Sequence, residues 1–458
     1  MKNSHEQYKR LLRYAFILLL ILGTSLAFLF CWITFYNEDI ILPFVKRGHW
    51  FIGAYYLLIQ SVLLSNFDGL KFGYLKKSNL VLSQSLASIC TNILMYLQIV
   101  LLSARFVTVL PILALCVFQV LFSLAVTGIS NLVFSKVFPA KKLLVIYDEY
   151  TPEAFVQKLA TRRDKYQIEK TVHISVGFEK LQEMVETVDG VVIFDVHSET
   201  RNKILKICFD KNIRTYTSSK VSDILIRGAE DIHLFDTPML LYRNNGLTFE
   251  QRFIKRLMDI VVSLVLLILT SPLMLFSALL IKLYDKGPVF FRQKRSTINN
   301  NTFMIHKFRS MIVDAEKDGV SHPATEEDPR ITPVGKFLRA TRLDELPQLI
   351  DILKGDMSLV GPRPERVEHT EKYTEEIPEF QYRLKVKGGL TGLAQLYGKY
   401  NTTPYDKLQL DLMYIQNYSV LLDLRLLFMT LKVMFIKEST EGFTEEKSKQ
   451  MGENEKKS

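Results

Sequence analysis

Long apolar runs without charged residues dominate the first third of the chain. They cover residues 14–36, 48–67, 78–104 and 106–135. Each run is close to or longer than the ~20 residues that an α-helix needs to cross the hydrocarbon core of a bilayer. The pattern therefore predicts a bundle of four transmembrane helices within residues 1–140. The first run is too long for a removable signal peptide, and no small-residue cleavage site follows it.

Lysines and arginines in the short connections predict the orientation of these helices. Such residues are concentrated before the first run, between the second and third, and after the fourth, whereas the other two loops hold few. Because cytoplasmic loops carry an excess of Lys and Arg, both ends of the bundle are expected in the cytosol. The residues on the expected inner side are Lys2, Lys9, Arg10, Arg13, Lys71, Lys76, Lys77, Lys136, Lys141 and Lys142, against Lys46, Arg47 and Arg105 on the outer side.

A fifth uncharged run covers residues 260–281 and has Ser271 and Pro272 in its middle. Proline removes an amide donor and clashes with the carbonyl of Ile268, while a neighbouring serine hydroxyl can bond a freed carbonyl. The residues after the run are strongly basic, so a full crossing would oppose the positive-inside bias. We therefore expect a re-entrant helix, broken at Ser271 and Pro272, that enters one leaflet and returns. A proline-kinked crossing helix is the alternative.

Residues 141–245 have the pattern of a small soluble α/β domain. Short apolar strands are predicted at 143–146, 191–194 and 213–216, with a helix beginning at 151–153, which indicates a parallel, Rossmann-like sheet. No glycine lies in the turn after the first strand, where Asp148 and Glu149 would repel a pyrophosphate, so a dinucleotide site is not expected. A regulatory or assembly role, which leaves room for a homo-oligomer, is the expectation. An unorthodox ligand site is the alternative.

Composition narrows the class of protein and its partners. The 458 residues are 48% hydrophobic and 23% charged with a net charge of +10, and the apolar content lies in blocks, which excludes a disordered chain and a simple soluble monomer. The positive charge favours anionic partners, either lipid headgroups or phosphorylated substrates. Nucleic acid is not expected, because the basic residues adjoin a membrane segment and no recognition motif accompanies them. The four cysteines form no disulfide framework, so the soluble parts are expected in the cytosol.

The C-terminal region, residues 250–437, starts with the re-entrant segment and continues with a basic α/β pattern. Alternating stretches at 290–295 and 303–311, joined by a turn at 299–301, predict a β-hairpin. Its cations, Lys307 and Arg309 among them, are candidates for binding a substrate phosphate or lipid headgroups. The stretch 411–435 is read as an interfacial amphipathic helix or, equally, an ordinary packed helix. The polar tail, residues 438–458, is expected to be disordered.

An acid pair, Asp344 and Glu345, lies in the string Leu-Asp-Glu-Leu-Pro-Gln at residues 343–348. Arg339 and Arg342 precede it by about one helical turn, so we expect their guanidinium groups to lower the carboxylate pKa and to bind phosphate. An ionised carboxylate beside such cations can attack phosphorus as a nucleophile. A hard divalent ion such as Mg²⁺ would neutralise charge between the acid and a diphosphate.

A second phosphate-binding element is predicted at residues 358–365, Ser-Leu-Val-Gly-Pro-Arg-Pro-Glu. Arg363 lies between two prolines, whose fixed backbone angles give a rigid loop. A guanidinium in a rigid loop is suited to binding phosphate in a bidentate way. Arg363 is therefore expected to act as a phosphate clamp.

With these strings in the order Lys-Phe-Arg-Ser-Met, Leu-Asp-Glu-Leu-Pro-Gln and Ser-Leu-Val-Gly-Pro-Arg-Pro-Glu, the chain resembles the bacterial sugar transferases that prime capsular and exopolysaccharide synthesis. These are polyprenyl-phosphate glycosyl-1-phosphate transferases, and the four predicted helices and α/β middle are similar to their large polytopic form. The resemblance implies transfer of a sugar 1-phosphate, glucose or galactose, from a UDP-sugar to undecaprenyl phosphate with release of UMP. It also implies a multi-pass protein of the bacterial inner membrane with a cytosolic catalytic domain.

The resemblance assigns roles to several residues. Asp344 would be the nucleophile that forms an aspartyl-phosphosugar and touches Mg²⁺, and Glu345 would assist it. The family's Lys-Pro-Gly-x-Thr-Gly-Trp-Ala-Gln loop corresponds to residues 387–395, with Gly388 and Leu393 in place of proline and tryptophan, and Arg342 and Asp351 also depart from the common residues. Nucleotide or sugar contacts are expected from this loop and the residues that follow it, at Thr391, Gln395 and Lys399.

Two other functions are compatible with the same sequence. The first is a catalytically silent membrane scaffold or regulator of polysaccharide assembly that keeps the fold. The second is a glycosyltransferase that moves the sugar without its phosphate. Release of UMP, of UDP or of neither nucleotide distinguishes the three.

Overall fold

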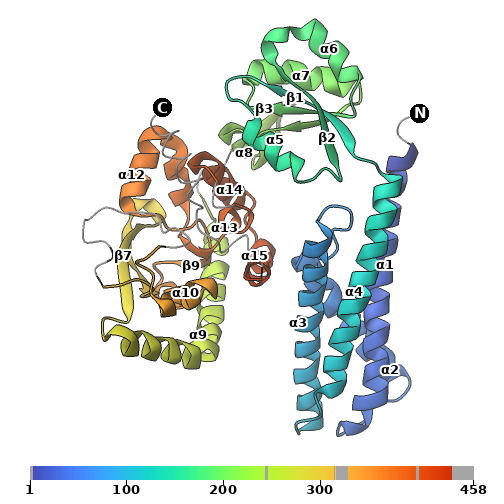
Figure 1. Ribbon diagram of the computed structural model, residues 1–458, viewed down its shortest axis with the longest axis vertical. Helices are drawn as coiled ribbons and strands as arrows, with labels where there is room; N and C mark the ends of the chain where they lie inside the picture. Colours follow the sequence, from blue (N-terminus) through green and yellow to red (C-terminus); the bar gives the residue numbers. More distant parts are fainter. Residues whose placement is uncertain (1–3, 243–245, 314, 316–327, 399–401, 436–458) are drawn as a thin grey trace. The chain divides into compact units, whose positions relative to one another are not determined.

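The computed structural model describes residues 4–242, 246–313, 315, 328–398 and 402–435 (Figure 1). The chain divides into two compact units, residues 1–219 and 220–458. The predicted tail at 438–458 and the site residue Lys399 lie outside the described residues.

Four long helices open the first unit: α1 (Ser4–Cys31), α2 (Arg47–Asn66), α3 (Lys77–Ser103) and α4 (Leu110–Val137). α1 and α3 each contact both α2 and α4. Within the described chain, four stretches are long and apolar enough to cross a membrane: Tyr8–Asp39, Lys77–Ser103, Leu110–Val137 and Phe249–Asp285. α2 is outside this group, so a four-helix transmembrane bundle stays a prediction.

Uncharged polar side chains connect these helices at their centre. Tyr56 of α2 donates its hydroxyl to Asn92 of α3 (3.1 Å), Asn92 donates its amide to Gln119 of α4 (2.8 Å), and Gln119 donates back to the Tyr56 oxygen (2.8 Å). All three side chains are buried. Because a polar group in an apolar interior costs free energy unless it is bonded, this closed ring favours one register of the helices.

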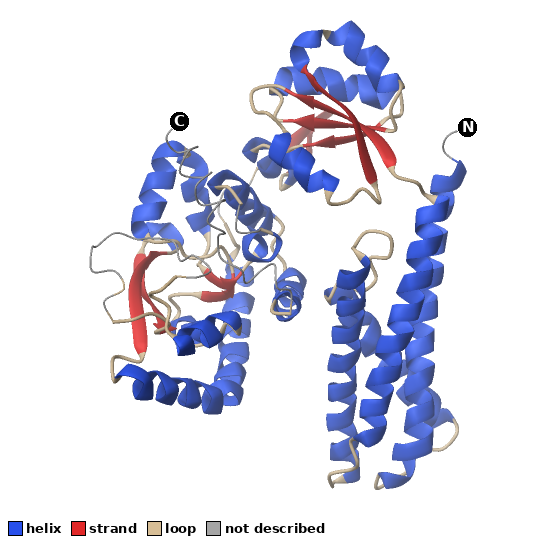
Figure 2. Ribbon diagram, viewed as in Figure 1, coloured by secondary structure: helices blue, strands red, loops and turns tan. Residues whose placement is uncertain are grey.

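The rest of the first unit is a parallel α/β domain, as predicted. Its sheet has the order β2-β1-β3-β4, from β1 (Lys141–Tyr147), β2 (Tyr166–His173), β3 (Gly190–Phe194) and β4 (Arg214–Thr217). Figure 2 shows helices on both sides of it: α6 (Phe178–Glu186) and α7 (Ser198–Asp210) cover one face, and α5 (Glu153–Ala160) covers the other. The edge strand β2 has no counterpart among the predicted strands, because charged and polar residues hide its alternation.

The second unit begins with a short helix, a hairpin and then one long helix, α9 (Phe249–Asp285), which Figure 1 shows bending sharply into two arms. Pro272 lies inside it, and the Ser271 hydroxyl donates to the Ile268 carbonyl at 2.9 Å. The predicted serine–carbonyl bond is thus present, but α9 continues through Pro272 as one helix and is not broken there. Most of the apolar side chains on α9 are exposed, and re-entry into one leaflet remains a prediction.

Several of the remaining elements of the second unit contact α9. The short helix α8 buries Val221 and Ile224 in the same core as β9 and α14, although the sequence pattern assigns it to the middle domain. The predicted basic hairpin is confirmed as β7 and β8, with Phe290 opposite Phe308 and with Asn299 and Asn300 left-handed in its turn. The elements are α8 (Val221–Arg227), β5 (Glu230–Leu234), β6 (Thr237–Leu241), β7 (Phe290–Ser296), β8 (Thr302–Phe308), α10 (Pro333–Ala340), η5 (Leu343–Glu345), α11 (Gln348–Lys354), β9 (Ser358–Val360), α12 (Val367–Glu376), η6 (Pro378–Lys385), β10 (Gly389–Thr391), α13 (Leu393–Tyr397), α14 (Pro404–Gln416) and α15 (Val420–Val433).

Candidate active site

The acid pair lies on η5, a single turn between α10 and α11. Thr332 caps α10 by accepting a hydrogen bond from Gly335, and Arg342 breaks the helix by adopting a left-handed conformation (φ 56°). Leu343 and Leu346, on either side of the pair, pack against a cluster that contains Ile281 of the second arm of α9. The two acids are therefore placed directly beside the apolar helix that is expected to enter the membrane.

Glu345 is held by two cations from distant parts of the chain. Its Oε1 accepts from Lys307 Nζ of β8 at 2.9 Å and from Arg363 Nη2 of the loop after β9 at 2.8 Å. Burial by itself raises the pKa of this carboxyl, but Lys307 and Arg363 outweigh it and hold the pKa well below its usual range. Glu345 is therefore ionised at neutral pH and neutralises part of the charge of both cations.

Asp344 differs from its neighbour, since its carboxylate has no hydrogen bond or ion pair with any described residue. Burial and the adjacent Glu345 raise its pKa, against the opposing fields of Lys307, Arg339 and Arg363. Arg339 thus lowers the pKa of Asp344 as predicted, but burial and Glu345 outweigh this effect, so the net shift is opposite to the predicted one. The pKa of Glu345 is lowered as predicted, by Lys307 and Arg363 instead of Arg339 and Arg342. A more basic, unpartnered carboxylate is a better nucleophile.

A small pocket adjoins the pair. It is lined by the cations Arg295, Lys307 and Arg363 together with Ile305, Gln348, Pro364 and Gly389. Among the described residues, Arg295 Nε and Gln348 Nε2 are buried without a hydrogen-bond partner. Three cations and two unused donors around one cavity suit an anion with several oxygen atoms, such as a phosphate.

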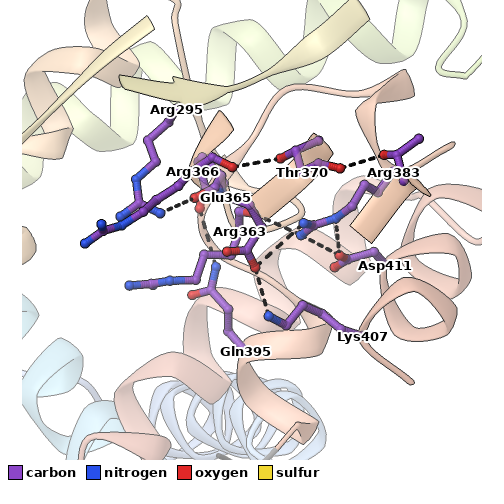
Figure 3. Close-up of polar contacts among 12 residues, drawn as sticks. Arg295, Arg363, Glu365, Arg366, Thr370, Arg383, Gln395, Lys407 and Asp411 are labelled. Carbon is purple, nitrogen blue, oxygen red and sulfur yellow. Dashed lines mark hydrogen bonds and ion pairs between the residues drawn. The ribbon is translucent and has the colours of Figure 1, made fainter. Parts of the chain in front are cut away.

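The loop that carries Arg363 is held by a buried charge network (Figure 3). Arg383 donates from Nη2 to the Arg363 carbonyl (2.9 Å) and contacts Asp411 Oδ2 through Nε (2.9 Å) and Nη2 (2.7 Å). Lys407 Nζ contacts Glu365 Oε1 at 2.8 Å. Burial alone raises the pKa of Glu365, but Lys407 and Arg383 outweigh it and lower the value to about 2. The network fixes the backbone at Arg363, and it shows that this part of 411–435 is packed in the interior.

One helix and one strand tie this core to α9. Lys255 of α9 contacts Asp423 of α15 at 2.6 Å, and both side chains are buried. Asp259 of α9 accepts from the hydroxyl of Ser358 (3.0 Å) and from the Leu359 amide (2.9 Å) of β9. The stretch 411–435 thus behaves as packed helices, with apolar side chains of α15 such as Leu421 also exposed. The first arm of α9 has a fixed orientation relative to the site.

The predicted site residues do not all meet at this pocket. Arg339 donates to Ser310 Oγ at 2.9 Å and contributes to the field at Asp344. Arg309, predicted to bind phosphate, instead pairs with Asp285 at the end of α9. Thr391 Oγ1 is bonded to the hydroxyl of Thr430 on α15 (2.8 Å), so its side chain faces the interior.

The other residues of the predicted nucleotide or sugar loop contribute mainly backbone. Gln395 donates weakly to the Gly389 carbonyl at 3.5 Å, and Gly389 itself lines the pocket. A Cβ added at Gly389 would lie 2.1 Å from the amide nitrogen of Gly361, so only glycine permits the close approach of β10 to the Arg363 loop.

Sequence reasoning missed two residues that shape the site, Gln348 and Arg383, and it included Arg295 only among the cations of the predicted hairpin. Arg295 donates to the Pro364 carbonyl (3.1 Å) and to Gln293 (2.7 Å), which positions it beside the Arg363 loop. Gln348 stands in the acid-pair string and Arg295 in the predicted hairpin, so their position in motifs was an available signal. Arg383 carried no such signal, because its partners lie 20 and 28 positions away.

The donor set around Asp344 fits Mg²⁺ only together with substrate oxygens. No group of three or more His, Cys, Asp or Glu side chains able to hold a metal occurs in the described part of the chain. Asp344 offers a free carboxylate, whereas Glu345 is already shared by two cations. Mg²⁺ commonly binds through one or two carboxylates plus substrate phosphates and water, so one carboxylate is a sufficient protein contribution.

Comparison with known proteins shows which family contains these motifs. The family described as "Bacterial sugar transferase" matches residues 250–437. The chain is 40% identical over 256 residues to the UDP-glucose:undecaprenyl-phosphate glucose-1-phosphate transferase of Klebsiella pneumoniae, covering 55% of this chain and 53% of the relative. It is 38% identical over 235 residues to the UDP-N-acetylgalactosamine-undecaprenyl-phosphate N-acetylgalactosaminephosphotransferase of Aeromonas hydrophila, covering 51% and 55%.

A shorter relative is matched over most of its length. The chain is 37% identical over 185 residues to the uncharacterized sugar transferase EpsL of Bacillus subtilis, covering 40% of this chain and 89% of the relative. By contrast, the chain spans about half the length of the two larger relatives. The similarity to the shorter protein extends over nearly all of its sequence.

Proposed function

The chain belongs to the bacterial sugar transferase family, and from this premise we propose that it transfers a sugar 1-phosphate from a UDP-sugar to undecaprenyl phosphate and releases UMP. The proposed sugar is glucose or galactose, and the product would start a capsular or exopolysaccharide chain. The observation that carries the proposal is the unpartnered Asp344 carboxylate beside a pocket lined by Arg295, Lys307 and Arg363. A nucleophile next to a polycationic pocket suits transfer of a phosphoryl group.

The proposed reaction has two displacement steps at one phosphorus atom. An Asp344 oxygen attacks the sugar-bearing phosphorus of the UDP-sugar, the bond to the bridging oxygen breaks, and UMP leaves with that oxygen. A phosphate oxygen of undecaprenyl phosphate then attacks the same phosphorus, the bond to Asp344 breaks, and the carboxylate is restored. The raised pKa of Asp344 supports this role, because basicity favours nucleophilic attack.

Glu345 and its two cations would stabilise the charge that moves during these steps. Lys307 and Arg363 each contact Glu345 and line the pocket, so the same two cations are available to contact a diphosphate. Removing a preorganised donor of this kind typically costs about 10²- to 10³-fold in rate. Arg339, held by Ser310, would contribute to the field at Asp344 from the other side.

Asp344 would also hold Mg²⁺ together with the substrate diphosphate. Bound there, the ion would act as a Lewis acid that neutralises phosphate charge.

We also propose the place of the reaction: the cytoplasmic face of the bacterial inner membrane, with α9 re-entering one leaflet. A soluble nucleotide sugar and a lipid phosphate must meet at the bilayer surface. The contacts of Leu343 and Leu346 with the second arm of α9 support an acid pair at that depth. The middle α/β domain would then serve assembly, through contacts between copies of the chain.

The proposed reaction is tested with membranes that contain the wild-type protein, undecaprenyl phosphate, Mg²⁺ and a panel of radiolabelled UDP-sugars. We expect one or a few sugars to appear in the lipid fraction with stoichiometric UMP, and Asp344→Asn to abolish both signals. Release of UDP would identify a glycosyltransferase that moves sugar alone. Full UMP release by Asp344→Asn, or no transfer by the wild type, would contradict the proposal and favour a scaffold.

The proposed topology is tested by cysteine labelling in intact spheroplasts with a membrane-impermeant maleimide, in a variant free of native cysteines. Leu42→Cys, in the expected outer loop, should be labelled. Phe249→Cys, at the first residue of α9, and Lys294→Cys, after the helix, should both be labelled only after the membrane is opened. Labelling of Lys294→Cys from outside would show that α9 crosses.

A further inference from the structure

Gln348 is a buried polar side chain that no role described so far explains. It is the first residue of α11, three positions after Glu345, and is 3% exposed. Its Nε2 is buried without a hydrogen-bond partner among the residues that the structure describes. Leaving a buried donor unpaired costs free energy, so such groups in native proteins require an explanation.

The surroundings of Gln348 indicate which kind of ligand would accept its unused hydrogen bond. It lines the pocket together with Arg295, Lys307 and Arg363, and Arg295 also has an unused donor, Nε. Glu345, which bonds two of these cations, is already shared by Lys307 and Arg363, and Glu365 is bonded to Lys407. The pocket thus has an excess of positive charge and of hydrogen-bond donors, which calls for a ligand that carries negative charge and only acceptors.

We propose that Gln348 is a substrate-contacting residue, whose Nε2 donates a hydrogen bond to a non-bridging phosphate oxygen in the pocket. This inference rests on the proposed function, since it names the group that the pocket holds during the reaction. Lys307 and Arg363 supply the charge, and Gln348 adds a neutral donor of fixed direction. The phosphate belongs either to the UDP-sugar or to the lipid acceptor, because both present such oxygens.

Two near-isosteric variants separate a substrate contact from a structural role. Gln348→Met removes the donor and also removes a buried unpaired amide, so the variant should unfold at the same or a higher temperature. Its kcat/KM for transfer should nevertheless fall by about 10- to 100-fold, the range for a hydrogen bond to a charged group. For Gln348→Glu, which adds a negative charge, kcat/KM should fall further. Gln381→Glu, the same change at an exposed glutamine of η6, is the matched control and should resemble the wild type.

Separate assays of the two half-reactions show whether the contacted phosphate belongs to the UDP-sugar or to the lipid acceptor. Exchange of labelled UMP into UDP-sugar without lipid tests the donor step alone. Loss of exchange in Gln348→Met assigns the contact to the nucleotide sugar, whereas normal exchange with a raised KM for undecaprenyl phosphate assigns it to the lipid. Either result supports the proposal, and wild-type rates for both steps overturn it.

Binding of inorganic pyrophosphate to the detergent-purified full-length protein keeps this inference separate from the proposed reaction. If the wild type transfers no sugar, the proposed function fails, but the pocket can still be tested as an anion site. We expect pyrophosphate to bind Gln348→Glu at least about tenfold more weakly than wild type or Gln381→Glu, because a carboxylate repels it. Equal affinity of all three proteins, or no binding to the wild type, would refute the phosphate contact.

Discussion

The buried pair of Arg383 and Asp411 gives a quantitative prediction about how the Arg363 loop is held. Arg383 is 2% exposed and Asp411 1% exposed, and the guanidinium also donates to the Arg363 carbonyl at 2.9 Å. Arg383→Met keeps most of the volume of the side chain but removes all of these bonds. The change leaves one buried carboxylate and one carbonyl without their partner.

The cost follows from the geometry. Removing one partner of a buried ion pair costs about 3–5 kcal/mol, because the other charge stays buried and unpaired. Burial already raises the pKa of Asp411 and Arg383 opposes that rise, so in Arg383→Met the carboxyl takes up a proton at higher pH. Protonation limits the loss, and we expect about 3 kcal/mol at neutral pH, a large part of the ~5–15 kcal/mol that stabilises a typical domain.

Activity should fall by more than stability explains. A displacement of about 1 Å at a substrate-positioning group can cost about a hundredfold in rate, and Arg383 fixes the backbone of Arg363. The double variant Arg383→Met/Asp411→Leu removes both charges and should regain most of the stability, since a buried pair can be replaced by apolar residues at little cost. It should not regain the rate, because the Arg363 carbonyl is still unbonded.

The measurement is local hydrogen exchange of η6 and α14, followed by mass spectrometry, together with initial rates of transfer. Tryptophan fluorescence does not report this change, since Trp32 and Trp50 both lie in the first unit. Arg227→Met, at an exposed arginine of α8, is the control. Full activity in the double variant, or unchanged exchange in Arg383→Met, would refute the reasoning.

Three further changes test other parts of the molecule. Glu365 has a pKa of about 2, below its usual value near 4.5. The ionised carboxylate therefore stabilises the fold by up to about 3 kcal/mol, an effect that is complete above pH 4.5 and is lost as the pH falls towards 2. Acid unfolding of Glu365→Gln should lack this pH dependence. Pro272→Ala should straighten α9 and raise external labelling of Lys294→Cys, and unchanged protection would speak against the proline break. Gln119→Leu breaks the polar ring and should lower the free energy of unfolding by about 1 kcal/mol, which is measured from the midpoint of tryptophan-detected unfolding. Adding Asn92→Leu to the same chain should recover part of the lost free energy.

Local sequence patterns were sufficient to predict those features of the structure that depend on residues close together in the chain. Alternation and the asparagine turn predicted the β7–β8 hairpin, because strand pairing across a short turn is a local event. The Ser271–Pro272 pair predicted the bond from the serine hydroxyl to the Ile268 carbonyl for the same reason, whereas the helix itself continues through the proline. The strand β2 was not predicted, because it is stabilised by pairing with β1, which begins 25 positions earlier in the chain.

The candidate acid pair was readable from the sequence, but its electrostatics were not. The motifs placed Asp344 beside Glu345 and predicted a phosphate-binding role for Arg363. Which cation pairs with which acid depends on distances between segments that are 18 to 38 positions apart, and these assigned Lys307 and Arg363 to Glu345 and left Asp344 free. The same folding took Arg309 to Asp285 instead.

The sequence by itself determined the apolar helices, the parallel α/β sheet and the motifs of the candidate site, since each follows from periodicity or from residues close together in the chain. Only the tertiary structure decided the opposite pKa shifts of the acid pair, the buried network around Arg383 and the unpaired amide of Gln348. The physical reason is that desolvation and Coulomb energy depend on distance and burial in space, and separation along the chain does not encode them.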